Sequence, residues 1–359
     1  MLTVSDIIRD HGTYPSAGKD FYARVKSKRI SQPEVNAYFQ RWVKKEWPWY
    51  PISMDIENTA VCNYSCSMCP QSDWPEHRRE GTPRAGMSYE VFKNIINDNP
   101  GLLEIKIQGI GEPTLQRSLC RCIIYARRKG IWVRTITNGS LLHLKRPDPQ
   151  GNNPPSTIAE QLVASDVCEI QISIDGATKD IFEKIRIGGK FEQVCANAAM
   201  LNTLTRRTKM WTVVQDDNAH QLDKLVKLAS ILGFPQLTFG LDVGNWGIEE
   251  RLKFKAENDV RNTLEPSYLL ELIELGKDYG IDVTYYGITE KYDRLNPCRW
   301  PTDRMWVGAE GKSSWCCIIS DPSIASYGEW GSEEHHKFMA QHASGQIPDL
   351  CKGCYKHRE

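Results

Sequence analysis

The sequence has no excess of charge of either sign and no long hydrophobic run. Lysine plus arginine number 45 and aspartate plus glutamate number 45, so the formal net charge is zero. The composition therefore shows neither the basic surface of a nucleic-acid-binding protein nor an acidic tail. No stretch approaches the roughly 18 consecutive apolar residues of a membrane span, and the first residues do not resemble a signal peptide. These absences predict a cytoplasmic protein that binds neither nucleic acid nor membranes.

Cysteine is too sparse for a scaffold held together by disulfides. The 12 cysteines are about 3% of the 359 residues, whereas such secreted proteins contain roughly 8–10%. In a protein that is not exported, reduced thiols are the default, and clustered thiols then indicate metal binding. The cysteines do cluster, three of them at residues 62–69 and five at residues 298–354.

Residues 52–241 alternate between short strand-like runs and helical patterns. The six expected strands are Ile52–Glu57, Leu103–Gly109, Trp132–Thr137, Glu169–Asp175, Met210–Gln215 and Gln236–Leu241. The expected helices between them are Ser88–Asn97, Leu115–Lys129, Ile181–Arg186, Val194–Thr205 and Ala219–Leu232. This alternation predicts an α/β protein with a parallel sheet, in which ligands bind at the carboxyl ends of the strands.

Three domains are expected along the chain. Residues 1–50 are interpreted as a helical lead-in that ends in a Trp-rich segment. Residues 51–289 contain the alternating strands and helices, interrupted by the proline-rich exposed loop Lys145–Ser156. Residues 290–359 are expected to form a small module of short hairpins, and they contain five of the 12 cysteines.

Cys62, Cys66 and Cys69 form a C-x3-C-x2-C pattern directly after the first expected strand. Their odd number argues against a disulfide framework. A zinc site would need a fourth ligand, for which His77 is the nearby candidate. Three thiolates instead suit a 4Fe–4S cluster with one iron left open to a substrate or cofactor.

Residues 52–245 resemble the radical S-adenosylmethionine (radical SAM) enzymes. The three-cysteine segment resembles the cluster loop of that family. Further segments match its motifs in the expected order, namely Gln108–Pro113, Thr135–Gly139, Ser173–Gly176 and Arg186. The resemblance implies a partial (β/α)6 TIM-like barrel, S-adenosylmethionine as cofactor, and a 4Fe–4S cluster on the three cysteines.

The resemblance also implies roles for individual residues. The cofactor-binding residues would be Gly109, Gly111, Glu112, Pro113, Asn138, Ser173, Arg186 and Met68. The Gly-Glu-Pro segment would bind the methionyl amino group, the asparagine would lie near the ribose, and the serine and arginine would hold the carboxylate. Met68 stands where many members have an aromatic residue, and its backbone would contact adenine. The reduced cluster would split the cofactor into a 5′-deoxyadenosyl radical that removes hydrogen from a substrate carbon.

The later cysteines resemble the SPASM/twitch module of some radical SAM enzymes. Cys298, Gly311 and Cys316 fit its opening, and the C-x2-C pair Cys351 and Cys354 follows. The short pattern fits the twitch form, which implies one auxiliary 4Fe–4S cluster ligated by these four cysteines. A zinc knuckle is the alternative, because four cysteines suit both kinds of site.

A hairpin is expected from Met305–Gly308 and Lys312–Cys316, with Gly311 at positive φ in the turn. Strand alternation would then point Cys317 to the side opposite the ligand before it. Such a thiol could return a hydrogen atom to a substrate radical, as in related radical SAM epimerases. The alternative is a buried structural cysteine.

The remaining candidates carry less specific signals. Asp216 and Asp242 follow the fifth and sixth expected strands, where a substrate base or hydroxyl anchor could lie. The adjacent His335 and His336 are expected on a solvated helix face. The cysteines assigned to packing are Cys120, Cys122, Cys168 and Cys195.

The sequence therefore predicts a radical SAM enzyme with two 4Fe–4S clusters. The pattern resembles the twitch-type dehydrogenase of aminocyclitol antibiotic biosynthesis. This resemblance implies dehydrogenation of a small polar substrate, with the auxiliary cluster as electron relay and a flavodoxin- or ferredoxin-type protein as reductant. The alternatives are epimerisation with Cys317 as hydrogen-atom donor, modification of a peptide, and a zinc-binding interaction protein.

Overall fold

The computed structural model describes residues 2–12, 51–70, 86–244, 251–287, 298, 300–346, 348–352 and 354. These residues divide into two compact units. The first unit holds the described residues of 1–13, 62–74 and 135–289, and the second holds those of 14–61, 75–134 and 290–359. The strand β3 (Trp132–Thr137) crosses the boundary, which falls after Arg134. The Trp-rich segment at residues 42–50 lies outside the described residues. The expected domain boundaries stay a prediction.

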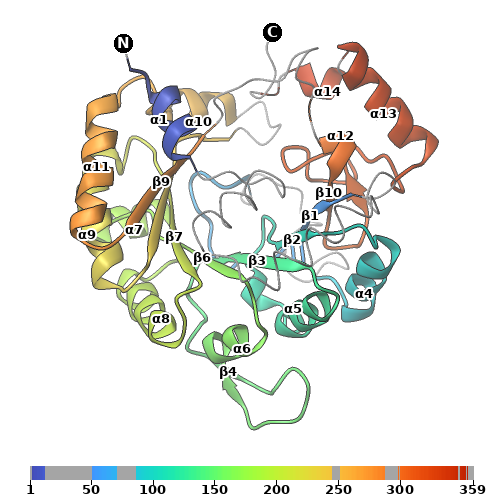
Figure 1. Ribbon diagram of the computed structural model, residues 1–359, viewed down its shortest axis with the longest axis horizontal. Helices are drawn as coiled ribbons and strands as arrows, with labels where there is room; N and C mark the ends of the chain where they lie inside the picture. Colours follow the sequence, from blue (N-terminus) through green and yellow to red (C-terminus); the bar gives the residue numbers. More distant parts are fainter. Residues whose placement is uncertain are drawn as a thin grey trace. The chain divides into compact units, whose positions relative to one another are not determined.

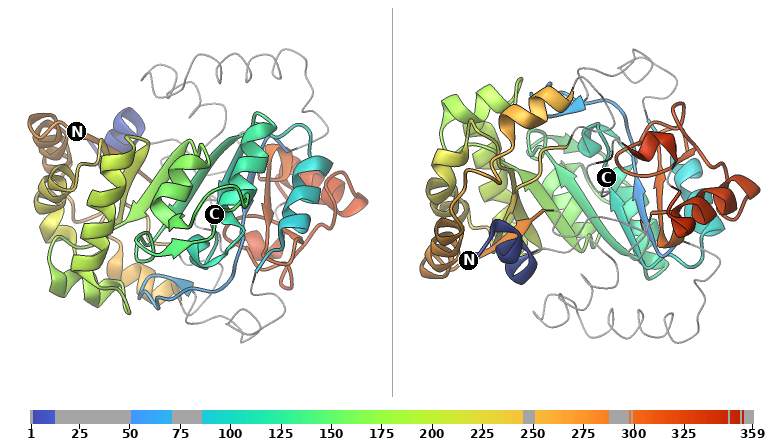
Figure 2. Two further views of the ribbon diagram at one scale, coloured as in Figure 1. Left: turned by 90° about the horizontal axis from the view of Figure 1, so that it is seen from below. Right: turned by 90° about the horizontal axis from the view of Figure 1, so that it is seen from above.

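The first unit contains four parallel strands with helices between them. In their order across the sheet the strands are β6 (Glu169–Ser173), β7 (Thr208–Val213), β8 (Gln236–Gly240) and β9 (Asp282–Tyr286). The helices and 3-10 turns are α1 (Val4–His11), α6 (Ile158–Ala164), α7 (Lys179–Ile185), α8 (Phe191–Leu204), η4 (Ala219–Gln221), α9 (Leu222–Ile231), α10 (Arg251–Asn258) and α11 (Pro266–Asp278). Helices α8, α9 and α11 lie on one side of the strands (Figures 1 and 2).

The pattern of buried residues explains why these segments form strands and helices. Every residue of β8 is buried, as expected for a parallel strand covered on both faces. Helix α9 buries Leu222, Leu225, Val226 and Ala229 at helical spacing and is followed by Gly233 at φ +80°. Ile231, the last residue of the helix, is 78% exposed.

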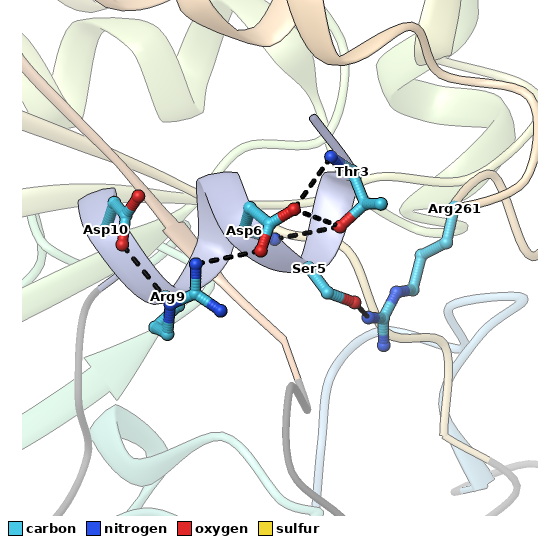
Figure 3. Close-up of polar contacts among 6 residues, drawn as sticks. All are labelled: Thr3, Ser5, Asp6, Arg9, Asp10 and Arg261. Carbon is cyan, nitrogen blue, oxygen red and sulfur yellow. Dashed lines mark hydrogen bonds and ion pairs between the residues drawn. The ribbon is translucent and has the colours of Figure 1, made fainter. Parts of the chain in front are cut away.

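Helix α1 occupies Val4–His11, at the start of the expected lead-in. It begins at a capping box, in which the Asp6 N–H donates to Thr3 Oγ1 and the Thr3 N–H donates to Asp6 Oδ2 (Figure 3). Val4, Ile7 and Ile8 are buried. Beyond the helix, Gly12 forms a parallel bridge with Tyr285, so the chain continues along the edge of β9.

The second unit is built around β1 (Ser53–Ile56), which pairs in parallel with both β2 (Glu104–Ile107) and β10 (Arg304–Val307). Strand β11 (Ser313–Ser314) pairs antiparallel with β10, and Gly311 between them has φ +83°. The expected hairpin is confirmed, although its second strand ends before Cys316. The helices are α4 (Tyr89–Asp98), η3 (Pro113–Leu115), α5 (Leu119–Arg128), α12 (Trp300–Asp303), α13 (Glu333–Ser344) and α14 (Asp349–Lys352).

The six expected strands are present as β1, β2, β3, β6, β7 and β8, most of them one to three residues shorter. Strand β9 was not predicted. The proline-rich loop is closed by two short antiparallel strands, β4 (Lys145–Arg146) and β5 (Ser156–Thr157). None of the helices within the described residues combines the length and apolar character that crossing a bilayer requires.

Candidate active site

The three-cysteine loop is anchored to the segment that follows α7. The N–H groups of Ser65 and Ser67 donate to the carbonyls of Ile187 and Ile185 at 2.9 and 3.2 Å. Gly188 has φ +92°, and a Cβ there would lie 3.3 Å from the Asn63 carbonyl oxygen. The backbone of this segment therefore approaches the loop closely and fixes its path.

The same loop folds onto an apolar cluster. Its buried members are Tyr64, Cys66, Met68 and Ile185, and the half-buried residues packed against them are Cys62, Cys69, Ile181, Val213 and Phe254. The structure thus brings the three predicted ligands together within the first unit. The Tyr64 N–H donates to Cys62 Sγ at 3.4 Å, and the Cys69 N–H donates to the Cys66 carbonyl at 3.0 Å.

These residues fit the iron–sulfur cluster that the loop suggests. Within the described residues, no three His, Cys, Asp or Glu side chains surround one metal-ion position. A 4Fe–4S cluster does not require such a position, because each thiolate binds a different iron of the cube. Burial raises the pKa of the Cys66 thiol, and the positive charge of Arg186 opposes that rise. The fit therefore rests on three clustered sulfur donors beside a fixed cation.

Arg186, predicted to bind the cofactor carboxylate, lies at the cluster loop. Its Nη1 is 3.9 Å from Cys66 Sγ, and its Nε is 2.5 Å from Asp175 Oδ2. Burial by itself lowers the pKa of Arg186, but the negative charges of Asp175 and Cys66 raise it by more, and the net shift is upward. The guanidinium is therefore a permanent cation in this site.

Asp175 is the residue that holds this cation, and no role had been predicted for it. It is fully buried, and its Oδ1 accepts a hydrogen bond from the Val213 N–H at 2.8 Å. Asn218 Nδ2 donates to its carbonyl at 2.8 Å. The predicted Ser173 is buried at the last position of β6, two residues before Asp175.

Asn138 is joined to the cluster loop through Asn63. Asn138 Nδ2 donates to Asn63 Oδ1 at 2.9 Å, and Asn63 Nδ2 donates to Ser140 Oγ at 3.0 Å. Asn197 of α8 donates to the carbonyls of Gly139 and Ser140 at 2.8 and 3.0 Å. This amide network fixes the end of β3 beside the loop. Neither supporting asparagine was predicted, because Asn63 lies inside the cysteine motif without being one of its cysteines and Asn197 lies in a region without a motif.

The Gly-Glu-Pro segment belongs to the second unit, where it packs against the chain that follows β1. A Cβ on Gly109 would lie 2.3 Å from Glu57 Cγ, and one on Gly111 would lie 2.2 Å from the Thr59 carbonyl oxygen. Both positions therefore require glycine. Glu57 Oε1 accepts from the Ile110 N–H at 3.0 Å.

Glu112 and Pro113 are fixed in the same way. The Glu112 N–H donates to the Val61 carbonyl at 2.8 Å. Its Oε1 accepts from the Thr114 N–H and hydroxyl, which caps η3. Asn58 Nδ2 donates to the Pro113 carbonyl at 3.1 Å. Glu57 and Asn58 were not predicted as site residues, yet they determine the shape of this segment.

The C-terminal cysteines also come together, within the second unit. Cys298, Trp300 and Trp306 form a buried group against which Cys316 and Cys317 pack. The pKa of Cys316 is raised well above its ordinary value, first by burial and then, to a smaller extent, by the neighbouring Cys317.

Cys351 and Cys354 join the same set of thiols. Burial, together with the nearby Cys298 and Cys354, raises the pKa of Cys351 to about 12. Cys351 Sγ also lies 4.0 Å from Nε2 of the buried His342. Each of the four predicted ligands therefore lies close enough to another of them to interact with it electrostatically.

The expected orientation of Cys317 is wrong. Strand β11 ends at Ser314, so strand alternation does not reach Cys317. Cys316 and Cys317 pack against the same group of Cys298 and two tryptophans. Cys317 is thus a fifth thiol of the cysteine cluster.

The two aspartates expected as substrate anchors lie in different surroundings. Asp216 is exposed after β7. Asp242 Oδ1 forms an ion pair with Arg261 Nη1 at 2.9 Å, and Arg261 Nη2 donates to Ser5 Oγ of α1 at 3.0 Å (Figure 3). Asp242 therefore takes part in attaching α1 to the first unit, and a substrate role for either aspartate stays a prediction.

The expectation of a solvated face for His335 is wrong. Helix α13 begins after the N-cap Ser332, and this start places His335, Phe338 and His342 on its buried side. His335 is 1% exposed, and its Nε2 lies 2.7 Å from the Pro301 carbonyl oxygen. Of the cysteines assigned to packing, Cys120 and Cys122 are buried and Cys168 and Cys195 are half-buried.

Residues 56–229 match the Radical SAM superfamily. This match covers just under half of the chain, and that part is a radical SAM domain, as its motifs predicted. A curated relative is the mycofactocin maturase MftC of Mycolicibacterium smegmatis, 30% identical over 185 residues, which are 51% of this chain and 43% of the relative. Another is the AdoMet-dependent heme synthase of Methanosarcina barkeri, 27% identical over 179 residues, covering 49% and 46%. The chain thus matches less than half the length of these relatives.

Solved structures confirm the α/β radical SAM fold. Streptococcus suis SuiB bound to the precursor peptide SuiA matches 86% of this chain and 68% of its own, with a TM-score of 0.58 and 14% identity. The enzyme anSMEcpe with bound AdoMet matches 85% and 83%, with a TM-score of 0.55 and 17% identity. At these identities the likeness establishes the fold alone.

Proposed function

We propose that this chain cleaves S-adenosylmethionine reductively at a 4Fe–4S cluster held by Cys62, Cys66 and Cys69. The observation that carries the proposal is the loop in which these three thiols meet beside Arg186. When bound, the cluster and its cofactor would supply a 5′-deoxyadenosyl radical that removes hydrogen from a substrate carbon.

The protein's own residues would bind and orient the cofactor. Arg186, which Asp175 keeps charged, would bind the carboxylate of the cofactor, because a guanidinium can form two parallel hydrogen bonds to a carboxylate. Asn138 would lie near the ribose, and the backbone of Met68 near adenine. We also propose that backbone groups of Gly109–Pro113 bind the amino group, and contacts with Glu57 and Thr59 hold this segment in shape.

The experiment is anaerobic reconstitution followed by assays of iron, sulfide and 5′-deoxyadenosine. Replacement of Cys62, Cys66 and Cys69 by alanine should remove about four irons per chain and abolish formation of 5′-deoxyadenosine. Cys195→Ala is the matched control, because Cys195 is half-buried on α8 outside the loop. Persistent cofactor cleavage in the triple variant would refute the site.

For the C-terminal cysteines we propose an auxiliary 4Fe–4S cluster that relays an electron during oxidation of a small polar substrate, such as an amino sugar or aminocyclitol. The support is the shared environment of Cys298, Cys316, Cys351 and Cys354. About eight irons and eight sulfides per chain are expected after reconstitution. Zinc at this site would instead favour the zinc-knuckle alternative, and zinc at both sites would favour a zinc-binding interaction protein.

A peptide substrate is the second candidate, because of the relatives. One is called a maturase, and the SuiB structure holds a precursor peptide. Incubation with small amino sugars and, separately, with peptides would distinguish the two substrate classes. Substrate-dependent formation of 5′-deoxyadenosine should increase with only one of them.

Cys317 distinguishes oxidation from epimerisation. We propose oxidation, since Cys317 packs with a predicted cluster ligand. In heavy water, Cys317→Ala should leave formation of the oxidised product unchanged. Loss of product with continued cofactor cleavage, together with deuterium incorporation by the unaltered enzyme, would instead assign Cys317 as hydrogen-atom donor.

A further inference from the structure

A side chain far along the sequence binds the cluster loop directly. Arg251, the first residue of α10, donates from Nη1 to the Ser67 carbonyl at 2.6 Å and from Nη2 to the Cys69 carbonyl at 2.7 Å. It is 6% exposed. Within α10, all of whose residues are described, Arg251 is the one buried residue.

Burial of this guanidinium is informative, because arginine is rarely buried without a specific partner. Two short charge-assisted hydrogen bonds compensate for the lost hydration. Both acceptors lie between Cys66 and Cys69 or on Cys69 itself, and the two bonds have the forked geometry that lysine does not provide. The sequence motifs had not indicated this residue.

Ser67 is held from two directions by these contacts. Its N–H donates to the Ile185 carbonyl at 3.2 Å, while its own carbonyl accepts from Arg251. The peptide units between two predicted ligands are thereby fixed on both sides. Phe254, one turn along α10, packs against the apolar cluster that contains the loop, and its ring centroid is 5.5 Å from the Arg251 guanidinium.

We infer that Arg251 is a positioning residue that fixes the spacing of Cys66 and Cys69 and favours the reduced state of their cluster. This inference rests on the proposed function. Reduction adds one negative charge, which a nearby fixed cation stabilises. As a general scale, a unit charge about 10 Å away at an effective dielectric constant of about 20 changes such a ratio by roughly tenfold.

The test compares three variants of the full, reconstituted chain. Arg251→Met keeps the apolar stem and removes the charge and both hydrogen bonds, whereas Arg251→Lys keeps the charge and loses the fork. Lys253→Met is the matched control, since it removes a cation from the same helix at a side chain that is 84% exposed. The readouts are an EPR-monitored redox titration, the rate of iron loss to a chelator, and amide hydrogen exchange of residues 66–69. The signal lost in Cys66→Ala identifies the relevant cluster.

Arg251→Met should lower the ratio of reduced to oxidised cluster about tenfold at a fixed potential, a negative shift of about 59 mV for one electron. It should also speed iron loss and amide exchange. Arg251→Lys should shift the reduction potential little, but its amides at residues 66–69 should exchange faster and its cluster should lose iron faster. Lys253→Met should match the unaltered chain. If Arg251→Met matched Lys253→Met in all three readouts, the inference would be wrong. Failure of the unaltered chain to assemble a cluster would instead overturn the proposed function.

Discussion

Replacement of Asp175 by asparagine should destabilise the first unit far more than loss of the more exposed ion pair between Lys184 and Asp217. Asp175 is fully buried, and the Arg186 side chain is 12% exposed. Asparagine has one acceptor oxygen, but the aspartate accepts from both Val213 N–H and Arg186 Nε. One buried donor is therefore left without an acceptor, and Arg186 without its counter-charge.

Removal of one partner from a buried ion pair typically costs about 3–5 kcal/mol. The matched control is Asp217→Asn, which removes the partner of Lys184 on α7, a pair with side-chain exposures of 61% and 31%. Exposed pairs are worth no more than about 1 kcal/mol. The expected difference between the variants is thus about 2–5 kcal/mol in the free energy of unfolding.

Urea denaturation of the anaerobically purified chain, followed by circular dichroism, measures this difference. Asp175→Asn should also weaken binding of S-adenosylmethionine, because the freed guanidinium can leave its position near Cys66. Equal destabilisation by the two variants would show that Asp175 does not hold a buried cation, and the assignment of Arg186 would lose its structural basis.

Two further predictions concern the second unit. In urea denaturation, Gly111→Ala should lower the free energy of unfolding by about 1–3 kcal/mol, because the added Cβ would lie 2.2 Å from the backbone oxygen of Thr59. Gly240→Ala should lower it by less, because the atom nearest to its added Cβ lies 3.3 Å away, on Trp211. Burial raises the pKa of Cys122 from 9.0 to about 12, so its stabilising contribution is complete below pH 9 and is lost as the pH rises towards 12. The free energy of unfolding should therefore differ less between pH 8 and pH 10 in Cys122→Ala than in the unaltered chain. An equal difference in the two proteins would contradict a buried neutral thiol.

The strands and the cluster loop were predictable because their signals are local. Apolar runs such as that of β8 reflect burial on both faces of a parallel strand, and this requires no knowledge of the neighbouring strands. The spacing of Cys62, Cys66 and Cys69 likewise belongs to one short loop. In contrast, β9 has the burial pattern of an edge strand, alternating between buried and more exposed residues, and its five residues carry a weak signal.

Helix phase and strand ends were less predictable, since they depend on one or two residues. The solvated reading of His335 assumed that the charges around it describe the whole helix. The cap at Ser332 instead sets a phase in which His335 faces inward and its charged neighbours face outward. Cys317 was misplaced for a similar reason, because two fewer strand residues remove the alternation on which its orientation depended.

The residues that support the site could not be predicted, because their partners are distant in the sequence and have no motif of their own. Arg251 is 184 residues from the Ser67 carbonyl that it binds, and its surrounding sequence resembles an ordinary charged helix. A sequence pattern reports side chains that share a face or a loop, whereas backbone carbonyls accept a hydrogen bond whatever residue bears them. The donors to the cluster loop therefore become visible only once the fold brings α10 to it. For this reason the structure adds positioning residues to the site, while the roles of Cys62, Cys66 and Cys69 as cluster ligands stay a prediction.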